Sequence, residues 1–239
     1  MENDIKVSVA MATYDGEKYI KEQIDSILSN MRSTDELVIS DDGSTDKTIE
    51  IISNYNDKRI KIFEGPRNGV KKNFENAIRL CDGDYIFLAD QDDIWEKNKI
   101  EEVMNVFKNN SKVSLIVHDA IVFESDSKEV LIESFFKFRK SSSGFIKNVI
   151  KNSYIGCCMA FSKELKKYIL DIPDDIEMHD QWIGIINDIY LEKAYFLKQK
   201  LIRYRRHQNN VSELKHYPFY KMLVNRIKFL KEIVKRGIK

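Results

Sequence analysis

The hydrophobic residues of the first 95 positions alternate between two spacings. Four short, nearly continuous apolar runs predict buried β-strands, at residues 7–12, 37–39, 60–63 and 85–89. Between these runs, apolar residues recur every three or four positions and predict three helices: residues 17–30, a helix with Asp46 as its N-cap, and about 71–80. Strands that alternate with helices in this way indicate an α/β domain with a doubly wound, mostly parallel sheet flanked by helices.

The pattern is less regular after Trp95. It predicts a helix up to Phe107, a strand over 113–117 that ends at His118 and Asp119, and a strand over 153–161. The remaining elements are a short helix, an apolar helix that opens at Met178, and two strands, at 163–170, 178–189, 195–197 and 201–204. Residues 124–145 carry the weakest pattern, and we expect their serines to form a surface loop.

The end of the chain predicts a basic amphipathic helix from His216 onward. Its apolar residues recur every three or four positions: Tyr220, Leu223, Ile227, Leu230 and Val234. Basic residues gather on the opposite side, with Glu232 as the only acid: Lys221, Lys228, Lys231, Lys235 and Arg236. Such a helix either docks on its own domain or lies on an anionic membrane surface, and the pattern leaves both interpretations open.

Composition narrows the class of protein without naming one. The 239 residues are 43% hydrophobic and 32% charged, which is typical of an ordinary globular chain. The net charge of +1 gives no electrostatic reason to expect nucleic acid as a partner. Three cysteines with no C-x-x-C pair indicate a reducing compartment and packing thiols, without a disulfide framework or a structural zinc site. No apolar run approaches the roughly 20 residues of a membrane span, so we expect a cytoplasmic protein that at most touches the inner face of the membrane.

Polar clusters follow all four predicted strands of the first part of the chain. Each comes directly after its strand or in the turn beyond it: residues 13–15, 41–42, 68–69 and 90–93. In parallel α/β sheets, ligands bind outside the carboxyl ends of the strands. A turn would explain any one cluster, but four together predict a ligand crevice.

The cluster Asp90-Gln91-Asp92-Asp93 predicts a divalent cation. Three carboxylates within four residues repel one another unless a positive charge lies among them. Mg²⁺ and Mn²⁺ take oxygen ligands, and Mg²⁺ commonly uses one or two carboxylates while substrate phosphates fill other positions. The alternative is an acidic turn in which Asp92 or Asp93 caps the segment that begins at Ile94.

Two phosphate-binding motifs are missing from the sequence. No Gly-x-Gly-x-x-Gly follows the first strand and no Walker-type Gly-Lys-Ser/Thr occurs, which disfavours dinucleotide cofactors and P-loop chemistry. A nucleoside diphosphate linked to a transferable group suits a metal held by carboxylates. Asp42 can accept a hydrogen bond from the ring N–H of the base, and Tyr14 can stack on the base. Neither assignment is specific without the fold, and simple packing also explains Tyr14.

Several of these motifs, in this order and spacing, resemble the inverting family 2 glycosyltransferases, which have the GT-A fold. The resemblance runs from Val7 to about Asn210, nearly the whole chain except the last helix. The matching segments along it are residues 7–15, 41–46, 68–69, 90–95, 179–182 and 205–211. The last three segments resemble the rhamnosyltransferase-type branch most. The resemblance implies a single GT-A domain over residues 1–212, with a nucleotide-binding half at 1–95 and an acceptor and catalytic half at 96–212. Residues 213–239 form the additional C-terminal helix.

The resemblance also implies roles for individual residues. Asp42 would bind the pyrimidine and Tyr14 would pack on it. Asp92 would ligate Mn²⁺ or Mg²⁺ with Asp90 nearer the ribose, and Asp180 would be the catalytic base. His207 would contact the metal or, with Arg206, the diphosphate. The rest of the donor pocket would be lined by Ala12, Thr13, Asp41, Asn68, Gly69, Lys71, Asn73 and Gln91.

Plainer interpretations of these residues remain open. From the residues alone, Asp180 would be the N-cap of a helix that begins at Gln181. His207 would be a surface histidine, and Arg205 and Arg206 would be solvated charges.

The expected function is metal-dependent, inverting transfer of a sugar, rhamnose for this branch, from a UDP- or dTDP-linked donor. The acceptor would be a glycan or lipid-linked glycan of a bacterial-type surface polysaccharide. A sugar-nucleotide nucleotidyltransferase is one alternative, but it would normally need a glycine-rich basic loop where residues 13–16 stand. A glycan-binding module that keeps the fold without turnover is another.

Overall fold

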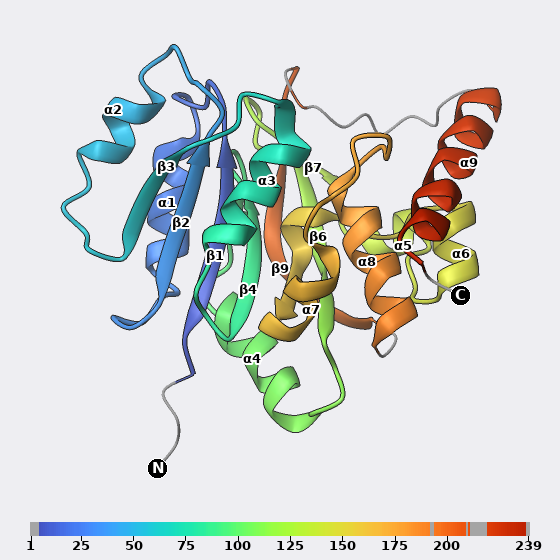
Figure 1. Cartoon of the computed structure of the whole chain (residues 1–239). Coiled ribbons are helices and arrows are strands. Elements are labelled where there is room, and N and C mark those ends of the chain that lie inside the picture. Colours follow the sequence, from blue (N-terminus) through green and yellow to red (C-terminus); the bar gives the residue numbers. More distant parts are fainter. Residues whose placement is uncertain (1–4, 192–193, 209, 211–218, 238–239) are drawn as a thin grey trace.

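Four parallel strands form the first half of the central sheet (Figure 1). Their spatial order is β3 (Ile60–Glu64), β2 (Glu36–Asp41), β1 (Val7–Thr13) and β4 (Tyr85–Asp90). The computed structural model describes residues 5–191, 194–208, 210 and 219–237. All seven residues of β1 are buried, because this strand lies between β2 and β4 with helices over both faces. The prediction of alternating strands and helices is confirmed here.

The second half of the sheet mixes strand directions. Beyond β4 the order continues with β8 (Met159–Ser162), β6 (Leu115–Glu124), β9 (Tyr195–Arg206) and β5 (Ile94–Trp95), while β7 (Val130–Ile132) pairs with β6. Strand β8 runs antiparallel to both neighbours, whereas β6 and β9 run parallel. The chain therefore extends one parallel sheet into a mixed one.

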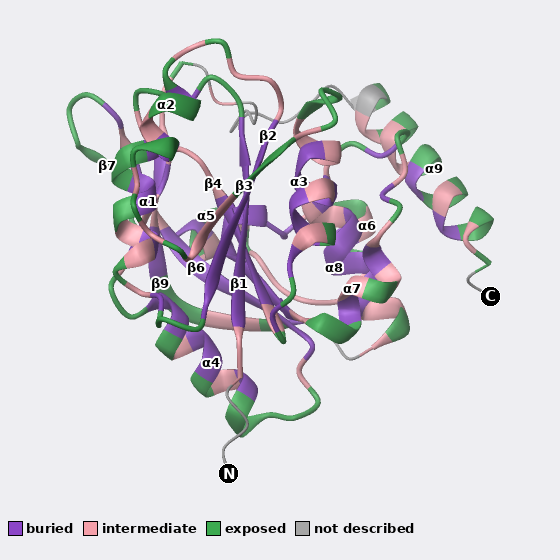
Figure 2. Cartoon of the chain, turned by 60° about the vertical axis from the view of Figure 1, so that its left-hand side comes forward, coloured by how far each residue is buried: buried purple, intermediate pink, exposed green. Residues whose placement is uncertain are grey.

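Helices cover both faces of the sheet (Figure 2). Helices α1 (Ile20–Leu28) and α4 (Lys99–Asn109) lie on one side, and α3 (Gly69–Leu80), α7 (Lys163–Ile169) and α8 (His179–Tyr190) lie on the other. The shorter elements are α2 (Thr48–Ser53), α5 (Phe135–Arg139), α6 (Phe145–Ile150) and the 3-10 helix η1 (Gly156–Cys158). Each long helix turns its buried stripe toward the sheet, as its apolar spacing predicts.

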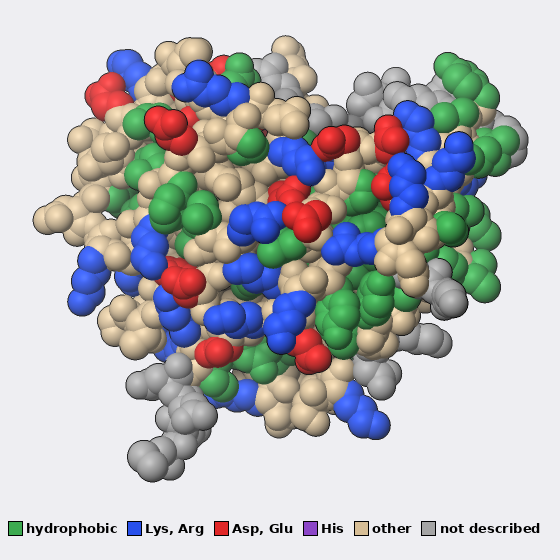
Figure 3. Space-filling model, in the orientation of Figure 1, with side chains coloured by type: hydrophobic (Ala, Val, Ile, Leu, Met, Phe, Trp, Pro, Cys, Tyr) green, Lys and Arg blue, Asp and Glu red, His purple; other side chains and the backbone are tan. Residues whose placement is uncertain are grey.

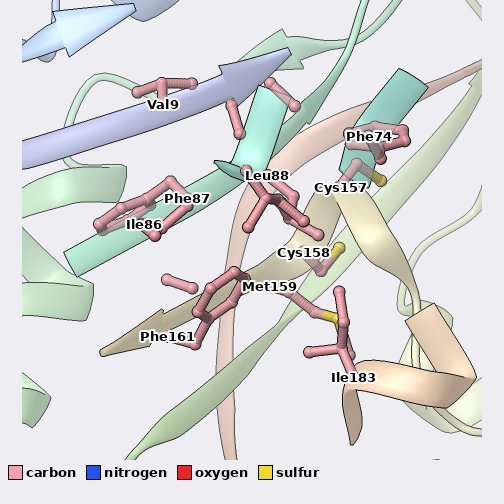
Figure 4. Close-up of a cluster of buried hydrophobic side chains, with 14 of the residues drawn as sticks. Val9, Phe74, Ile86, Phe87, Leu88, Cys157, Cys158, Met159, Phe161 and Ile183 are labelled. Atoms are coloured by element: carbon pink, nitrogen blue, oxygen red, sulfur yellow. The ribbon is translucent and has the colours of Figure 1, made fainter. Parts of the chain in front are cut away.

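One part of the core lies between the sheet and α8 and includes two of the cysteines (Figure 4). Cys157 and Cys158 pack among Phe74, Met159 and Ile183, and all three cysteines of the chain are free and buried. A hydrogen bond between Cys157 and Cys158, together with burial, raises the pKa of Cys157 well above its ordinary value. The interpretation of the cysteines as packing thiols is confirmed.

Several elements of the second half differ from the predictions. Only Met159–Ser162 of the predicted strand 153–161 is a strand, because the chain first forms a 3-10 turn at Gly156–Cys158. Strand β6 continues past its predicted end at Asp119, whose buried carboxylate accepts hydrogen bonds from Ser134 Oγ at 2.5 Å and Phe136 N at 2.9 Å. The two strands predicted at 195–204 are one strand with register shifts against β6.

The C-terminal helix α9 (Phe219–Lys235) docks on the domain through residues other than the predicted stripe. Phe229 and Ile233 are buried, and the Phe229 ring meets the edge of Trp182 with 5.8 Å between centroids. The predicted start at His216 lies outside the described residues. Each of the five stripe residues is at least 41% exposed: Tyr220, Leu223, Ile227, Leu230 and Val234. Among the described helices, none has the length and apolarity needed to cross a membrane.

Candidate active site

A cavity of about 1300 Å³ opens at the carboxyl ends of β1, β2 and β4. One wall comes from the first half of the sheet and the other from η1, the start of α8 and the end of β9. The cavity brings together most of the predicted site residues: Ala12, Thr13, Tyr14, Asp42, Gly69, Asn73, Asp90, Gln91, Asp92, Asp180 and His207. Its size suits a ligand larger than a typical drug molecule.

Reciprocal hydrogen bonds hold the strand-end loops of the first wall. The amide of Gln91 donates to Tyr14 O and accepts from Tyr14 N, both at 2.9 Å. Asp15 Oδ1 accepts from Thr45 N at 2.8 Å, which links the loops after β1 and β2. The Tyr14 side chain stays 55% exposed and lines the cavity, so its ring is open to a stacking ligand.

The carboxylate of Asp42 binds backbone N–H groups at the start of α3. It accepts hydrogen bonds from the backbone N–H groups of Gly69 at 2.8 Å and Asn68 at 3.3 Å. Gly69 has a φ of +80°, a conformation that favours glycine. A carboxylate offers about four lone pairs, so Asp42 keeps acceptor capacity toward the cavity.

Four predicted donor-pocket residues do not line the cavity: Asp41, Asn68, Lys71 and Arg206. The carboxylate of Asp41 instead accepts hydrogen bonds that hold its own turn, including Ser44 N at 2.8 Å and Thr13 Oγ1 at 2.8 Å. Lys71 donates to the backbone oxygens of Asp174 and Ile176, which ties α3 to the segment before α8. Asn68 meets Asp42 through its backbone, and the Arg206 guanidinium lies 6.0 Å from the Tyr204 ring centroid. Their predicted contacts with a donor therefore find no support in the cavity lining.

Asp92 lies in a polar cluster with His207 and Asn210. Asp92 Oδ2 is 2.8 Å from His207 Nε2 and accepts from Asn210 Nδ2 at 3.2 Å. The Tyr19 ring stacks on the imidazole, with 4.7 Å between centroids and 25° between planes. Neither Tyr19 nor Asn210 was predicted as a site residue, although Asn210 belongs to the 205–211 segment.

Arg205 supports this cluster from behind. Its side chain is almost completely buried, and Nε donates to Asp92 O at 2.6 Å. Its backbone N–H donates to Asp93 Oδ1 at 3.0 Å, and its guanidinium pairs with Glu22. The interpretation of Arg205 as a solvated charge is therefore wrong. A fixed guanidinium holds the backbone of the acidic turn in place.

The donor atoms of Asp92 and His207 fit a small divalent cation. Adjacent ligands of an octahedral ion at about 2.1 Å lie about 3 Å apart, close to the 2.8 Å between Asp92 Oδ2 and His207 Nε2. A deeper trio, Asp90, Asp93 and Cys157, has potential ligand atoms within 4.8 Å of one another, but its thiol is a soft ligand that Mg²⁺ and Mn²⁺ do not favour. Burial and the charge of Asp92 raise the pKa of Asp90 to about 7. Positive charge in the cavity would stabilise the ionised carboxylate of Asp90 and lower its pKa.

Asp180 lies on the opposite wall, in the first turn of α8. The helix begins at His179 with Met178 as N-cap, so the interpretation of Asp180 as an N-cap is wrong. Its Oδ1 accepts from Gln181 N at 2.5 Å and Asn152 Nδ2 at 3.4 Å. Burial raises the pKa of Asp180 to about 6. A carboxylate of that basicity, facing a cavity, is suited to accept a proton near neutral pH.

Comparisons with known proteins point to one family. The sequence model of Glycosyl transferase family 2 matches residues 8–170. The chain is 29% identical, over 84% of its length, to dTDP-rhamnosyl transferase RfbG of Shigella flexneri and covers 72% of that protein. It is 38% identical to a glycosyltransferase of Haemophilus influenzae over 45% of its length, but covers only 44% of that relative.

A solved structure shows the same fold. Residues 1–349 of S. aureus TarS, crystallised with UDP-GlcNAc, superpose with a TM-score of 0.71 at 19% identity, over 96% of this chain and 67% of that one. The family model spans more than half of the sequence, and the fold agrees with it. The chain therefore belongs to glycosyl transferase family 2.

Proposed function

We propose that this chain is a metal-dependent, inverting glycosyltransferase that uses a UDP- or dTDP-linked sugar. The acceptor would be a glycan or lipid-linked glycan in surface polysaccharide synthesis. One observation carries the proposal: the cavity has Asp90 and Asp92 on one wall and Asp180 on the other. A leaving diphosphate needs positive charge beside it, and an attacking hydroxyl needs a base on the opposite side.

The first wall would hold the nucleotide. The exposed ring of Tyr14 offers a stacking surface, and Asp42 has lone pairs left to accept the ring N–H of a pyrimidine. The side-chain amide of Asn73 is held at the cavity lining because its Nδ2 donates to Thr13 O at 3.1 Å. Asp90 would lie nearer the ribose. These contacts select a pyrimidine without choosing between uracil and thymine.

Asp92 and His207 would hold the cation, Mn²⁺ or Mg²⁺. When bound, the ion neutralises charge that develops on the departing diphosphate. Arg205 keeps the backbone of Asp92 fixed through the 2.6 Å hydrogen bond to its carbonyl oxygen. Tyr19 and Asn210 keep the imidazole of His207 in its orientation.

Asp180 would accept the proton of the acceptor hydroxyl. The hydroxyl oxygen then forms a bond to the anomeric carbon, and the bond from that carbon to the diphosphate oxygen breaks. Attack from the wall opposite the diphosphate inverts the configuration at the anomeric carbon. With a pKa of about 6, Asp180 is mostly ionised at pH 7 and ready to take the proton.

The two walls suggest how the chain divides its work. Residues 1–95 would bind the nucleotide, residues 96–212 would carry the base and the acceptor, and helix α9 in the last segment, 213–239, would be an accessory element. Similarity to RfbG supports dTDP-rhamnose as the first donor to try. The chain covers less than half of one relative, so acceptor and linkage are not transferred by analogy.

The helix α9 would contact an anionic membrane surface. Its exposed apolar stripe lies at the edge of the molecule beside basic side chains (Figure 3). Lys231 and Lys235 line one shallow surface hollow together with Ile227, Leu230 and Val234 of the stripe, and their charge is opposite to that of anionic lipid headgroups. A lipid-linked acceptor would then be reached from the membrane surface.

A donor panel tests the proposal. The purified chain is incubated with Mn²⁺ and dTDP-rhamnose, UDP-glucose, UDP-GlcNAc or GDP-mannose, with and without EDTA, and released nucleoside diphosphate is measured. We expect metal-dependent release from a pyrimidine-linked donor. Absence of binding and release for every donor would overturn the proposal, and release of pyrophosphate from a sugar phosphate and a nucleoside triphosphate would favour a nucleotidyltransferase.

A further inference from the structure

His179 is a buried titratable group of the cavity that the proposed transfer step does not use. It is 3% exposed, yet it lines the cavity beside Asp180. Neither of its ring nitrogens has a hydrogen-bond partner among the described residues. Buried polar groups without partners are rare in folded proteins because leaving them unpaired is unfavourable. An unpartnered imidazole at a cavity wall points to a ligand that completes it.

The ring of His179 is held in place by its neighbours. It stacks on Phe74 of α3, with 4.2 Å between centroids and 25° between planes. Gly156 of η1 lies beside Nε2, where an added Cβ would come within 2.9 Å of that nitrogen. Glycine therefore lets the backbone pack directly against the ring, and both ring nitrogens are buried. The imidazole therefore has a fixed orientation before any ligand binds.

The chemistry of the site favours a hydroxyl as that ligand. Burial and the nearby charge of Lys71 lower the pKa of His179 to about 3, so the ring is neutral near pH 7. A neutral imidazole has one N–H donor and one acceptor nitrogen, and a sugar hydroxyl likewise donates and accepts. The cavity lining also has apolar side chains, namely Val70, Phe74, Ile155 and Met178, of which Phe74 stacks on His179, and these suit the C–H face of a pyranose ring.

Two other ligands fit less well. An anionic phosphate would gain little from an uncharged ring that lies beside the Asp180 carboxylate. A metal ion would need further ligands, and within the described part of the chain the metal-type cluster found is Asp90, Asp93 and Cys157, without His179.

We propose that His179 is a specificity-determining residue that hydrogen-bonds a hydroxyl of the transferred sugar. This inference rests on the proposed function, because it assumes a nucleotide-sugar donor in the cavity. The transferred sugar is favoured over the acceptor sugar because His179 is nearly inaccessible, whereas the neighbouring Asp180 is only partly buried. The donor would enter the cavity first, so its sugar would lie against His179, the more enclosed of the two groups.

The test compares nucleotide with nucleotide sugar. His179→Phe keeps an aromatic ring for Phe74 but removes both nitrogens, and His179→Asn restores a donor and an acceptor without the stack. Affinities are measured by calorimetry in an Asp180→Asn background, so that the donor is not consumed. We expect His179→Phe to bind free nucleoside diphosphate as the parent does and to bind the nucleotide sugar about tenfold more weakly, the value of one hydrogen bond. His179→Asn should recover part of the loss.

Donors that lack single hydroxyls identify the contact. One monodeoxy donor should bind the parent about tenfold more weakly, and His179→Phe should not distinguish that donor from the complete one. Equal weakening for nucleotide and nucleotide sugar, or no weakening for either, would overturn the inference. So would an unchanged donor affinity with a raised acceptor KM, measured with His179→Phe in a chain that retains Asp180, since the hydroxyl would then belong to the acceptor. If the parent binds nucleoside diphosphate but no nucleotide sugar, the proposed function fails and this inference with it.

Discussion

The two walls of the cavity treat their polar groups in different ways. On the first wall, the strand-end loops bind one another, as in the reciprocal pair of Gln91 and Tyr14. On the second wall, His179 has no partner among the described residues, and Asp180 has a raised pKa. The loops of the first wall are thus joined to one another before a ligand arrives, although that wall also has an atom without a partner in the described part of the chain, Asn73 Oδ1, and a raised pKa at Asp90. On the second wall, a whole imidazole lacks partners from the described residues next to the proposed base. This difference suggests that the first wall positions the nucleotide, while the second wall provides the catalytic base and selects the sugar.

Removing the cation ligand of the first wall should have the largest effect. Asp92→Asn keeps the shape and the contact with Asn210 but weakens the hold on a divalent ion. We expect transfer to fall below detection, with nucleotide binding no longer sensitive to Mn²⁺ or EDTA. The fold should survive, because Arg205 holds the backbone oxygen of Asp92 and not its side chain.

Released nucleoside diphosphate and calorimetry measure this effect, with Asp171→Asn as the matched control. The Asp171 side chain is 87% exposed and pairs with Arg79 outside the cavity lining. Full metal-dependent activity in Asp92→Asn would show that the cation is held elsewhere, with Asp90 and Asp93 as the next candidates.

Removing the base of the second wall should have the next largest effect. Asp180→Asn accepts no proton, and loss of a general base costs about 10²- to 10⁴-fold in rate. Donor affinity should stay the same, since the first wall is intact. A loss of rate without a loss of donor affinity would support different roles for the two walls. Equal losses of rate and donor affinity would contradict that division.

The pH profile provides an independent check on Asp180. A raised pKa means that the carboxyl group is protonated and inactive below about pH 6 and becomes a base above it. The kcat/KM of the wild-type chain should therefore rise through pH 6 and then level off. Asp180→Asn should lose this inflection, and a profile that keeps it would assign the inflection to another group.

The sequence predicted the first wall better than the second for a physical reason. Alternating strands and helices place residues 13, 41 and 90 at the same edge of a parallel sheet, whatever the loops do. Side-chain direction within those loops was not predictable: Asp41 turns toward its own backbone, and Lys71 reaches the segment before α8. On the second wall, the burial of Arg205 depends on Glu22, which is 183 residues away in the chain. A contact of that range leaves no local pattern in the sequence. The lack of hydrogen-bond partners around His179 among the described residues likewise depends on η1 and α3, which are distant from it in the chain.

Glu36 tests whether the rigidity of the first wall originates in its strands. Its side chain, at the start of β2, is 3% exposed and accepts from Lys6 Nζ at 2.8 Å, Lys61 Nζ at 2.7 Å and Ser8 Oγ at 2.6 Å. Although burial alone would raise it, these hydrogen bonds lower the pKa of Glu36 from 4.5 to about 2. A lowered pKa stabilises the fold above pH 4.5 by at most about 3 kcal/mol, and the contribution is lost as the pH falls toward 2.

Urea unfolding of the wild type and Glu36→Gln measures this contribution. The variant should be less stable at pH 7 by up to about 3 kcal/mol, and the difference should shrink to less than half at pH 3. Donor affinity at pH 7 should be unchanged, because Glu36 lies at the opposite end of the strand from the cavity. A constant difference between pH 7 and pH 3 would mean that packing, and not charge, accounts for the role of Glu36.

The smallest effect concerns α9, which lies outside both walls and presents two apolar sides. One side docks through Phe229 and Ile233, and the other leaves Ile227 and Leu230 48% and 41% exposed. If the exposed side meets an anionic membrane, Ile227→Ser with Leu230→Ser should reduce co-sedimentation with phosphatidylglycerol vesicles and leave the melting temperature unchanged. Each nearby lysine adds about 1 kcal/mol at low salt, so binding of the wild type should weaken as salt rises.

Phe229→Ser is the contrasting variant and should lower the melting temperature, since it removes the buried contact with Trp182. Equal sedimentation of the double variant and the wild type, or a concentration-dependent dimer that the double variant abolishes, would assign the exposed side to another occupant and leave both walls as they are.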